Sequence, residues 1–116
     1  MQREAQYNME VNMLKDAIYV IDDDLKDAEM YAEAAKTAKE KGADECARIY
    51  ANKAKHRAGE DFEQSKTVLN NVIQKMANSG MKSAPDSIEA MLWAEAMNKY
   101  TSWAERIKLK IKNMGY

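Results

Sequence analysis

The sequence contains few of the residues that make loops, disulfides and metal sites. Its 116 residues include one proline, four glycines, one cysteine and one histidine. Because proline and glycine interrupt helices, so few of them predict a helical chain. With Cys46 alone, no disulfide forms within the chain, and a reducing compartment is expected. With His56 alone, one chain has no metal cluster built on several histidines.

Long apolar runs and a strong net charge are also missing. No apolar run approaches the roughly 18 residues of a membrane-spanning helix, and the opening MQREAQYNME is too polar for a signal peptide. The formal net charge is −1, so no bulk field attracts nucleic acid or an anionic membrane. We therefore expect a single cytoplasmic domain over residues 1–116, with no membrane contact and no cofactor.

Apolar residues recur in alternating steps of four and three, which is typical of helices in coiled-coil packing. The three runs are Val11, Leu14, Ile18, Ile21, Leu25, Ala28, Ala32, Ala35; Ala47, Ala51, Ala54, Ala58, Phe62, Ser65, Leu69, Val72, Met76; and Ala90, Trp93, Met97, Tyr100, Ala104, Ile107, Ile111, Met114. They predict helices over about 3–41, 44–78 and 85–114. The alanines beside residue 42 predict that the first two helices draw together there.

The connection between the first two helices predicts a hairpin. Gly42 suits the left-handed residue that ends a helix, and Asp44 is expected to cap the next one. Two long helices joined by about two residues must be antiparallel neighbours. Pro85 fits the first turn of the third helix, with Ser83 or Asp86 as its cap. The predicted fold is all-α, an up-down-up three-helix bundle.

The third helix carries more apolar surface than a hairpin groove needs. A second line of Ile88, Leu92, Ala96 and Trp103 runs beside its seam. Deep burial in the bundle and a homodimer contact both explain it, and both alternatives stay open. The helix ends in a basic run. We take the following residues as the candidate interaction surface: Ile88, Leu92, Trp93, Trp103, Lys108, Lys110 and Lys112.

The run YAEAAKTAKEKGADECARIYANKA, Tyr31 to Ala54, resembles the first hairpin of rubrerythrin-type ferritin-like proteins. About 35 residues share the spaced alanines, the glycine turn and the ARIY-like stretch. The resemblance implies a four-helix fold, with the fourth helix supplied by a second chain. It also implies a di-metal site whose second helix carries a Glu-x-x-His pair.

Carried over residue by residue, the ligand positions of that family are largely lost. The first-helix carboxylate falls on Asp24, which can still bind a metal, but the glutamate of the pair falls on Arg57 and the histidine on Glu60. Arginine does not ligate iron, and it places a fixed positive charge there. Asp24 and Glu60 are therefore weak metal candidates, and Asp24, Arg57 and Glu60 are predicted to form a structural ion pair instead.

No nucleophile elbow, phosphate loop, dinucleotide-binding or zinc motif is present. We therefore expect that the chain is not an enzyme. The leading prediction is a non-enzymatic interaction module, a small adaptor or inhibitor that binds a protein through a helical face. The alternative is a ferritin-like protein with a degenerate or reduced metal site at a dimer interface. Nucleic-acid binding through the basic end of the third helix is a weaker prediction.

Overall fold

The computed structural model describes residues 2–78 and 88–116, and the side chains of residues 12–75 and 94–116. All secondary structure in the described chain is helical, so the all-α prediction is confirmed. The elements are α1 (Gln2–Glu40), α2 (Asp44–His56), the π-helical turn η1 (Arg57–Asp61), α3 (Phe62–Asn78) and α4 (Ile88–Asn113). Their ends lie within a few residues of the predicted ones. The caps predicted at Ser83, Pro85 and Asp86 fall outside the described residues.

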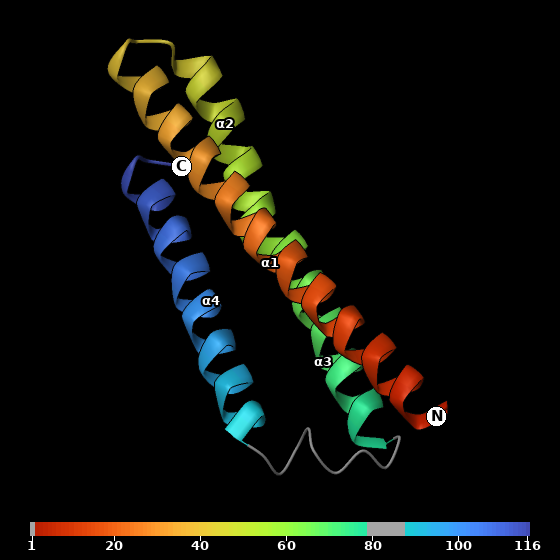
Figure 1. The fold of residues 1–116 in the computed structure, drawn as a ribbon. Coiled ribbons are helices and arrows are strands. Elements are labelled where there is room, and N and C mark those ends of the chain that lie inside the picture. The colour runs from red at the N-terminus through yellow and green to blue at the C-terminus, as the bar shows by residue number, and fades with distance from the viewer. Residues whose placement is uncertain (1, 79–87) are drawn as a thin grey trace.

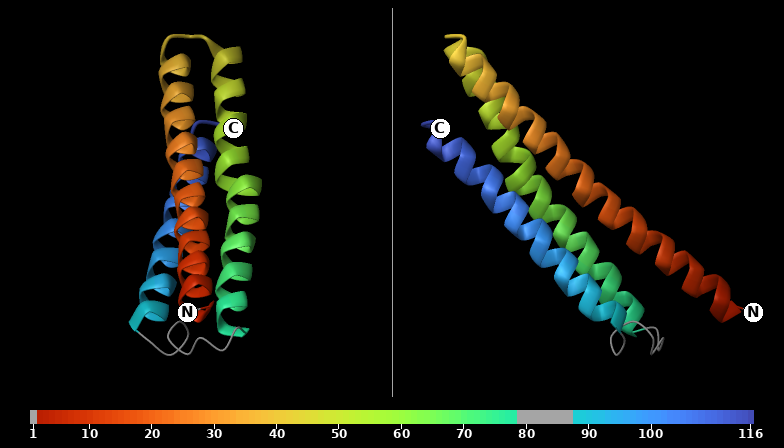
Figure 2. Two further views of the ribbon diagram at one scale, coloured as in Figure 1. Left: turned by 45° about the vertical axis from the view of Figure 1, so that its right-hand side comes forward. Right: turned by 60° about the vertical axis from the view of Figure 1, so that its left-hand side comes forward.

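The helices form a long, narrow molecule. The segment from α2 through η1 to α3 lies beside α1, and α4 lies along both (Figures 1 and 2). The molecule measures 61 × 21 × 16 Å, with a radius of gyration of 17.7 Å. A compact chain of this length has a radius of gyration of about 13 Å. No helix of the described chain is long and apolar enough to cross a membrane.

The turn between α1 and α2 is a Schellman motif centred on Gly42. Gly42 has φ of +78°, its N–H donates to Lys39 O, and the N–H of Ala43 donates to Ala38 O at 2.8 Å. The predicted left-handed glycine is therefore confirmed. The predicted cap at Asp44 is wrong, since Ala43 is the N-cap residue and has no side-chain bond. Asp44 instead lies in the first turn, where its charge favours the helix dipole.

The core residues of α1 and of the α2–α3 segment change from small to mostly larger along the molecule. Near the turn they are alanines, against which α4 packs Ile107 and Ile111. The members of the core are Leu14, Ala17, Ile21, Leu25, Ala28, Ala32, Ala35, Ala51, Ala54, Ala58, Phe62, Leu69, Val72, Ala104, Ile107 and Ile111. Small residues let the backbones of α1 and α2 approach, whereas α1 and α3 diverge toward the N-terminus (right view of Figure 2).

The second helix is not a regular α-helix, although its sequence pattern predicts one. Residues Arg57–Asp61 form one π-helical turn between α2 and α3. The spacing of the buried residues explains where the π turn lies. Ala54, Ala58 and Phe62 are buried and are separated by two successive intervals of four residues. A regular helix would rotate the seam away from α1 at the second step. The wider π turn takes up the extra residue and keeps Phe62 buried.

We expect the two hairpin glycines to respond oppositely to alanine. Gly42→Ala places a Cβ on a left-handed residue and should lower the free energy of unfolding by about 1–2 kcal/mol. Gly59 has no positive φ, and an added Cβ meets nothing within 4 Å. Gly59→Ala should therefore raise stability by up to about 1 kcal/mol. Urea denaturation measures both, and a destabilised Gly59→Ala variant would show that the π turn needs glycine.

Candidate functional site

A buried carboxylate lies at the middle of the helical hairpin. Asp24 is 7% exposed and is the only buried charged residue among the described side chains. Its Oδ2 accepts a hydrogen bond from Ser65 Oγ at 2.9 Å, and its Oδ1 lies 3.4 Å from Arg57 Nη1. A buried charge is tolerated when it is paired and hydrogen-bonded, and Asp24 meets both conditions.

Arg57 connects Asp24 to two further carboxylates. Its Nη1 lies 3.5 Å from Asp61 Oδ2, and its Nη2 lies 4.0 Å from Asp27 Oδ2. The Arg57 side chain is 39% exposed, so one end of the cluster is buried and the other faces solvent. We call Asp24, Asp27, Arg57, Asp61 and Ser65 the Asp24 cluster. It holds three carboxylates against one guanidinium.

Glu60 does not join this cluster, although the ligand positions carried over from the family resemblance predict that it pairs with Asp24 and Arg57. Its side chain is 76% exposed, and its Oε2 lies 3.3 Å from His56 Nδ1. The other ring nitrogen of His56, Nε2, lies 3.5 Å from Asp61 Oδ1. In the π turn, the residue four positions after Arg57 lies on the same side of the helix as Arg57. Asp61 therefore occupies the place beside Arg57 that was expected for Glu60.

The Asp24 cluster does not fit the di-metal centre that the family resemblance implies. Both Asp24 oxygens already accept hydrogen bonds, from Ser65 and from Arg57. The guanidinium carries a fixed positive charge, which opposes a cation at this place. Within the described residues, no group of three or more histidine, cysteine, aspartate or glutamate side chains is arranged to hold a metal ion.

Two grooves lie along the hairpin on the side away from α4. The apolar groove, of about 410 Å³, is lined by Met13, Asp16, Ala17, Val20, Ser65, Val68 and Val72. The polar groove, of about 560 Å³, is lined by Tyr31, Asn52, Lys53, His56, Arg57 and Asp61. Neither is lined by a described residue of α4. We call these two surfaces, with the exposed part of the Asp24 cluster between them, the open face.

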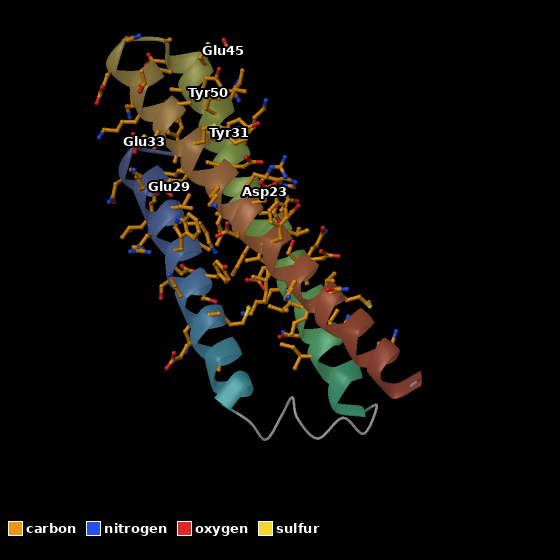
Figure 3. The ribbon with its side chains drawn as sticks, in the orientation of Figure 1. Asp23, Glu29, Tyr31, Glu33, Glu45 and Tyr50 are labelled. Carbon is orange, nitrogen blue, oxygen red and sulfur yellow. The ribbon has the colours of Figure 1, made fainter. Side chains whose placement is uncertain are left out.

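Aromatic residues lie at one end of the open face. The rings of Tyr31 and Tyr50 stack with centroids 6.3 Å apart, and Lys53 Nζ lies 5.5 Å from the centre of the Tyr31 ring. Figure 3 shows both tyrosines on one side of the hairpin, whereas Glu29 and Glu33 lie on the side toward α4. This surface was not predicted from the sequence, although Tyr31 and Tyr50 flank the alanine seams at helical spacing.

Part of the interaction surface predicted on α4 is used within the chain. Trp103 Nε1 donates to Glu29 Oε2 at 3.1 Å, and Lys110 Nζ bonds to Glu33 Oε1. Lys108 pairs with Glu105 on its own helix at 3.1 Å. Of the other residues proposed there, Lys112 is exposed. The side chains of Ile88, Leu92 and Trp93 lie outside those that the structure describes.

Lysines from two helices hold the far end of α4. Lys39 Nζ bonds to Met114 O, and Lys55 Nζ bonds to Tyr116 O. These cations complement the negative end of the helix dipole. The bond from Lys110 lowers the pKa of Glu33 below its usual value. Burial raises the pKa of the Tyr100 hydroxyl. The bonds of Lys39, Lys55, Trp103 and Lys110 thus tie α4 to the hairpin.

Removing the guanidinium tests how far the cluster stabilises the hairpin. Arg57→Met leaves the buried Asp24 with only the Ser65 hydroxyl, and we expect the free energy of unfolding to fall by about 1–3 kcal/mol. The control is Arg48→Met, which removes an exposed pair with Glu45 and should change stability by less than about 0.5 kcal/mol. Adding Asp24→Asn to Arg57→Met should restore part of the loss. Equal effects of the two arginine variants would contradict this role.

Engineered metal binding tests which residue faces Asp24 after the π turn. The pair Arg57→Glu with Glu60→His should gain no Co²⁺ binding, because Glu60 points to solvent beside His56. The double substitution Arg57→Glu with Asp61→His places a glutamate and an imidazole beside the Asp24 carboxylate. This variant should bind Co²⁺, which is detected by the visible absorption of the bound ion. Binding by the first pair alone would place Glu60, and not Asp61, beside Asp24.

No protein-family model matches the chain, and searches of curated proteins and of solved structures found no match. The resemblance to ferritin-like proteins therefore stays a prediction from about 35 residues.

Proposed function

We propose that this chain is a non-enzymatic protein-interaction module, an adaptor or inhibitor, which binds its partner through the open face. In this proposal the helices form an up-down-up three-helix bundle. The three helices serve as a rigid support, and the hairpin side away from α4 makes the contact. This proposal replaces the flank of α4 as the leading surface, since Trp103 and Lys110 already bond to α1.

The order of the contacts supports this arrangement of helices. Along the hairpin, Asp24 contacts Arg57 and Tyr31 contacts Tyr50, so the partner number falls as the α1 number rises. This order is that of antiparallel neighbours. Along α4, Glu29 contacts Trp103 and Glu33 contacts Lys110, so both numbers rise together. An up-down-up bundle has both properties.

The observation that carries the proposed function is the apolar surface of the hairpin. Eight large apolar side chains are exposed among those described, and seven of them belong to α1, α2 and α3. They are Met13, Tyr19, Val20, Met30, Ile49, Tyr50, Val68 and, on α4, Leu109. Met13, Val20 and Val68 line one groove. Clustered apolar side chains beside polar ones are typical of a protein-binding surface.

The chemistry of the cluster favours binding over the alternative of a reduced metal site. Arg57 occupies the position that a metal ligand would need, and it neutralises Asp24 directly. The cluster also has one end open to solvent, with Asp27 34% and Asp61 25% exposed. Charges of this kind discriminate between partners by rejecting those with unmatched charge. A specific binder needs such a fixed polar group between its apolar contacts.

Site-specific photo-cross-linking tests the proposed surface. A benzophenone amino acid in place of Val68 should cross-link the chain to a bound protein in cells that contain it. The matched control carries the same group in place of Leu109, because both side chains are exposed to nearly the same degree, 54% and 56%. We expect a cross-linked product from position 68 and none from position 109.

Competition makes the result specific. Excess unlabelled wild-type chain should abolish the product from position 68, whereas excess Val68→Asp chain should not, because a buried unpaired carboxylate disfavours docking. A product from position 109 alone would move the contact surface to α4. Cross-linking from neither position, in cells that contain the chain's partners, would remove the interaction module as the function.

A further inference from the structure

The groove between α1 and α4 carries a surplus of positive charge. Its volume is about 480 Å³, and its charged lining residues are Lys99, Arg106 and Lys110 on α4 and Glu29 on α1. We propose that this groove binds an acidic helix of a partner protein, whose carboxylates pair with the cations of α4. This site is separate from the open face of the proposed function, which lies on the side of the hairpin away from α4.

The cations belong to a single stripe along α4. Lys99, Trp103, Arg106 and Lys110 follow one another at intervals of four, three and four residues, which places them on one face of a helix. At about 1.5 Å per residue, the stripe is roughly 17 Å long, or about three turns. All four side chains line the groove, so the stripe faces α1 along this whole length.

Two of these cations are available to a ligand. Lys110 Nζ bonds to Glu33 Oε1, so its charge is neutralised within the chain. Lys99 and Arg106 are exposed, and none of the ion pairs among the described residues includes either of them. Lys99 and Arg106 therefore supply most of the charge that a ligand in the groove meets.

Apolar side chains line the groove between the cations. Ala32 on α1 and Ile107 on α4 are 0% and 3% exposed, and the half-buried ring of Trp103 lies beside them. A groove with an apolar floor and charged residues along its edge is typical of sites that bind an amphipathic helix. The floor supplies contact area, and the cations decide which helix is accepted.

The spacing of the cations fits a helical occupant. Carboxylates that lie four and seven residues apart on a helix are about 6 and about 10.5 Å apart along its axis. Arg106 lies four residues from Lys110 and seven from Lys99, so a helix alongside α4 can place one carboxylate opposite each cation. Charge pairs between neighbouring helices select the partner of a coiled coil in the same way. The expected segment has acidic residues at these intervals and apolar residues between them.

A nucleic acid fits the same groove less well. Its strand carries a phosphate at every nucleotide, and Glu29 and Glu33 lie among the cations, where they repel such a dense charge. Trp103 is also occupied, since its ring stacks with Tyr100 at a centroid distance of 6.4 Å and its Nε1 donates to Glu29 Oε2 at 3.1 Å. Less of the ring is then left for a base to stack on. These contacts favour spaced carboxylates as the ligand.

Titration of the full chain with an acidic peptide tests the proposal. The probe is a helical peptide of about 18 residues, built of alanine, leucine and glutamine, with glutamates four and seven residues apart on one face. In NMR spectra of the labelled chain, the Trp103 indole N–H signal should shift with a Kd on the order of 100 µM, and added salt should weaken binding. A peptide of the same composition, whose glutamates point in different directions, should bind at least about tenfold more weakly.

Charge reversal separates the groove from the net charge of the chain. Arg106→Glu places a carboxylate in the groove and should weaken binding of the acidic peptide about 10-fold. The matched control is Lys112→Glu, which makes the same change in net charge at an exposed residue of the same helix outside the groove. It should change the Kd by less than about twofold. Equal losses from the two variants would show attraction by net charge alone and would refute the site.

Two other results would also overturn the proposal. One is an unchanged Trp103 signal at about 1 mM peptide, and the other is tighter binding of a thymidine oligonucleotide with the same number of charges. Val68→Asp alters the open face and should leave the peptide Kd unchanged, whereas Arg106→Glu should leave the cross-link from position 68 unchanged. Loss of one binding with retention of the other therefore shows which surface fails. Leu109 does not line the groove, so it remains a valid control for the open face.

Discussion

The contacts of Asp24 fix the register of the hairpin. A carboxylate that is 7% exposed is costly unless its hydrogen-bonding capacity is met, and here Arg57 and Ser65 meet it from the opposite helix. Sliding the helices by one turn would leave the charge buried without partners, whereas the alanines near the turn would accept many registers. The polar contact thus selects one arrangement that apolar packing alone would leave degenerate. The tyrosine pair and the two grooves depend on this register.

The π turn lets the same helix satisfy two different neighbours. The seam that faces α1 advances by four residues twice in succession, at Ala54, Ala58 and Phe62. A regular helix could bury Phe62 only by rotating all of α3 about its axis. Because the turn is wider, Arg57 and Asp61 stay on one side and Phe62 remains in the core. Local irregularities of this kind are common at functional sites, and this one lies within the Asp24 cluster.

The sequence predicts most of the hairpin, because short-range rules decide its geometry. Spacing, the glycine turn and the near-equal helix lengths led to the helix limits, whereas the pairing of Asp24 with Arg57 was predicted from the family resemblance. The π turn was missed because the second step of four at Phe62 passed for ordinary variation. Glu60 was assigned to the cluster because the histidine position of the resembled family falls on it, whereas Asp61 takes that place in the structure. The role of Trp103 and Lys110 was missed for another reason. Periodicity gives two apolar lines on α4, but only tertiary packing decides which one turns inward.

In the proposed function, the apolar and the charged side chains of the open face have different roles. This difference gives a reason for the chain to keep apolar side chains exposed to water. Met13, Val20 and Val68 supply apolar contact area. The free energy gained by covering this area depends little on which apolar surface covers it. The exposed carboxylates of Asp27 and Asp61 and the guanidinium of Arg57 add little affinity, since charges lose hydration when they are covered. In the proposed function, they would exclude any occupant that leaves one of them unpaired. Because Asp24 already holds Arg57 in place, this proposed selection would need no rearrangement, and the buried ion pair that orients the hairpin would also set the specificity of the proposed surface.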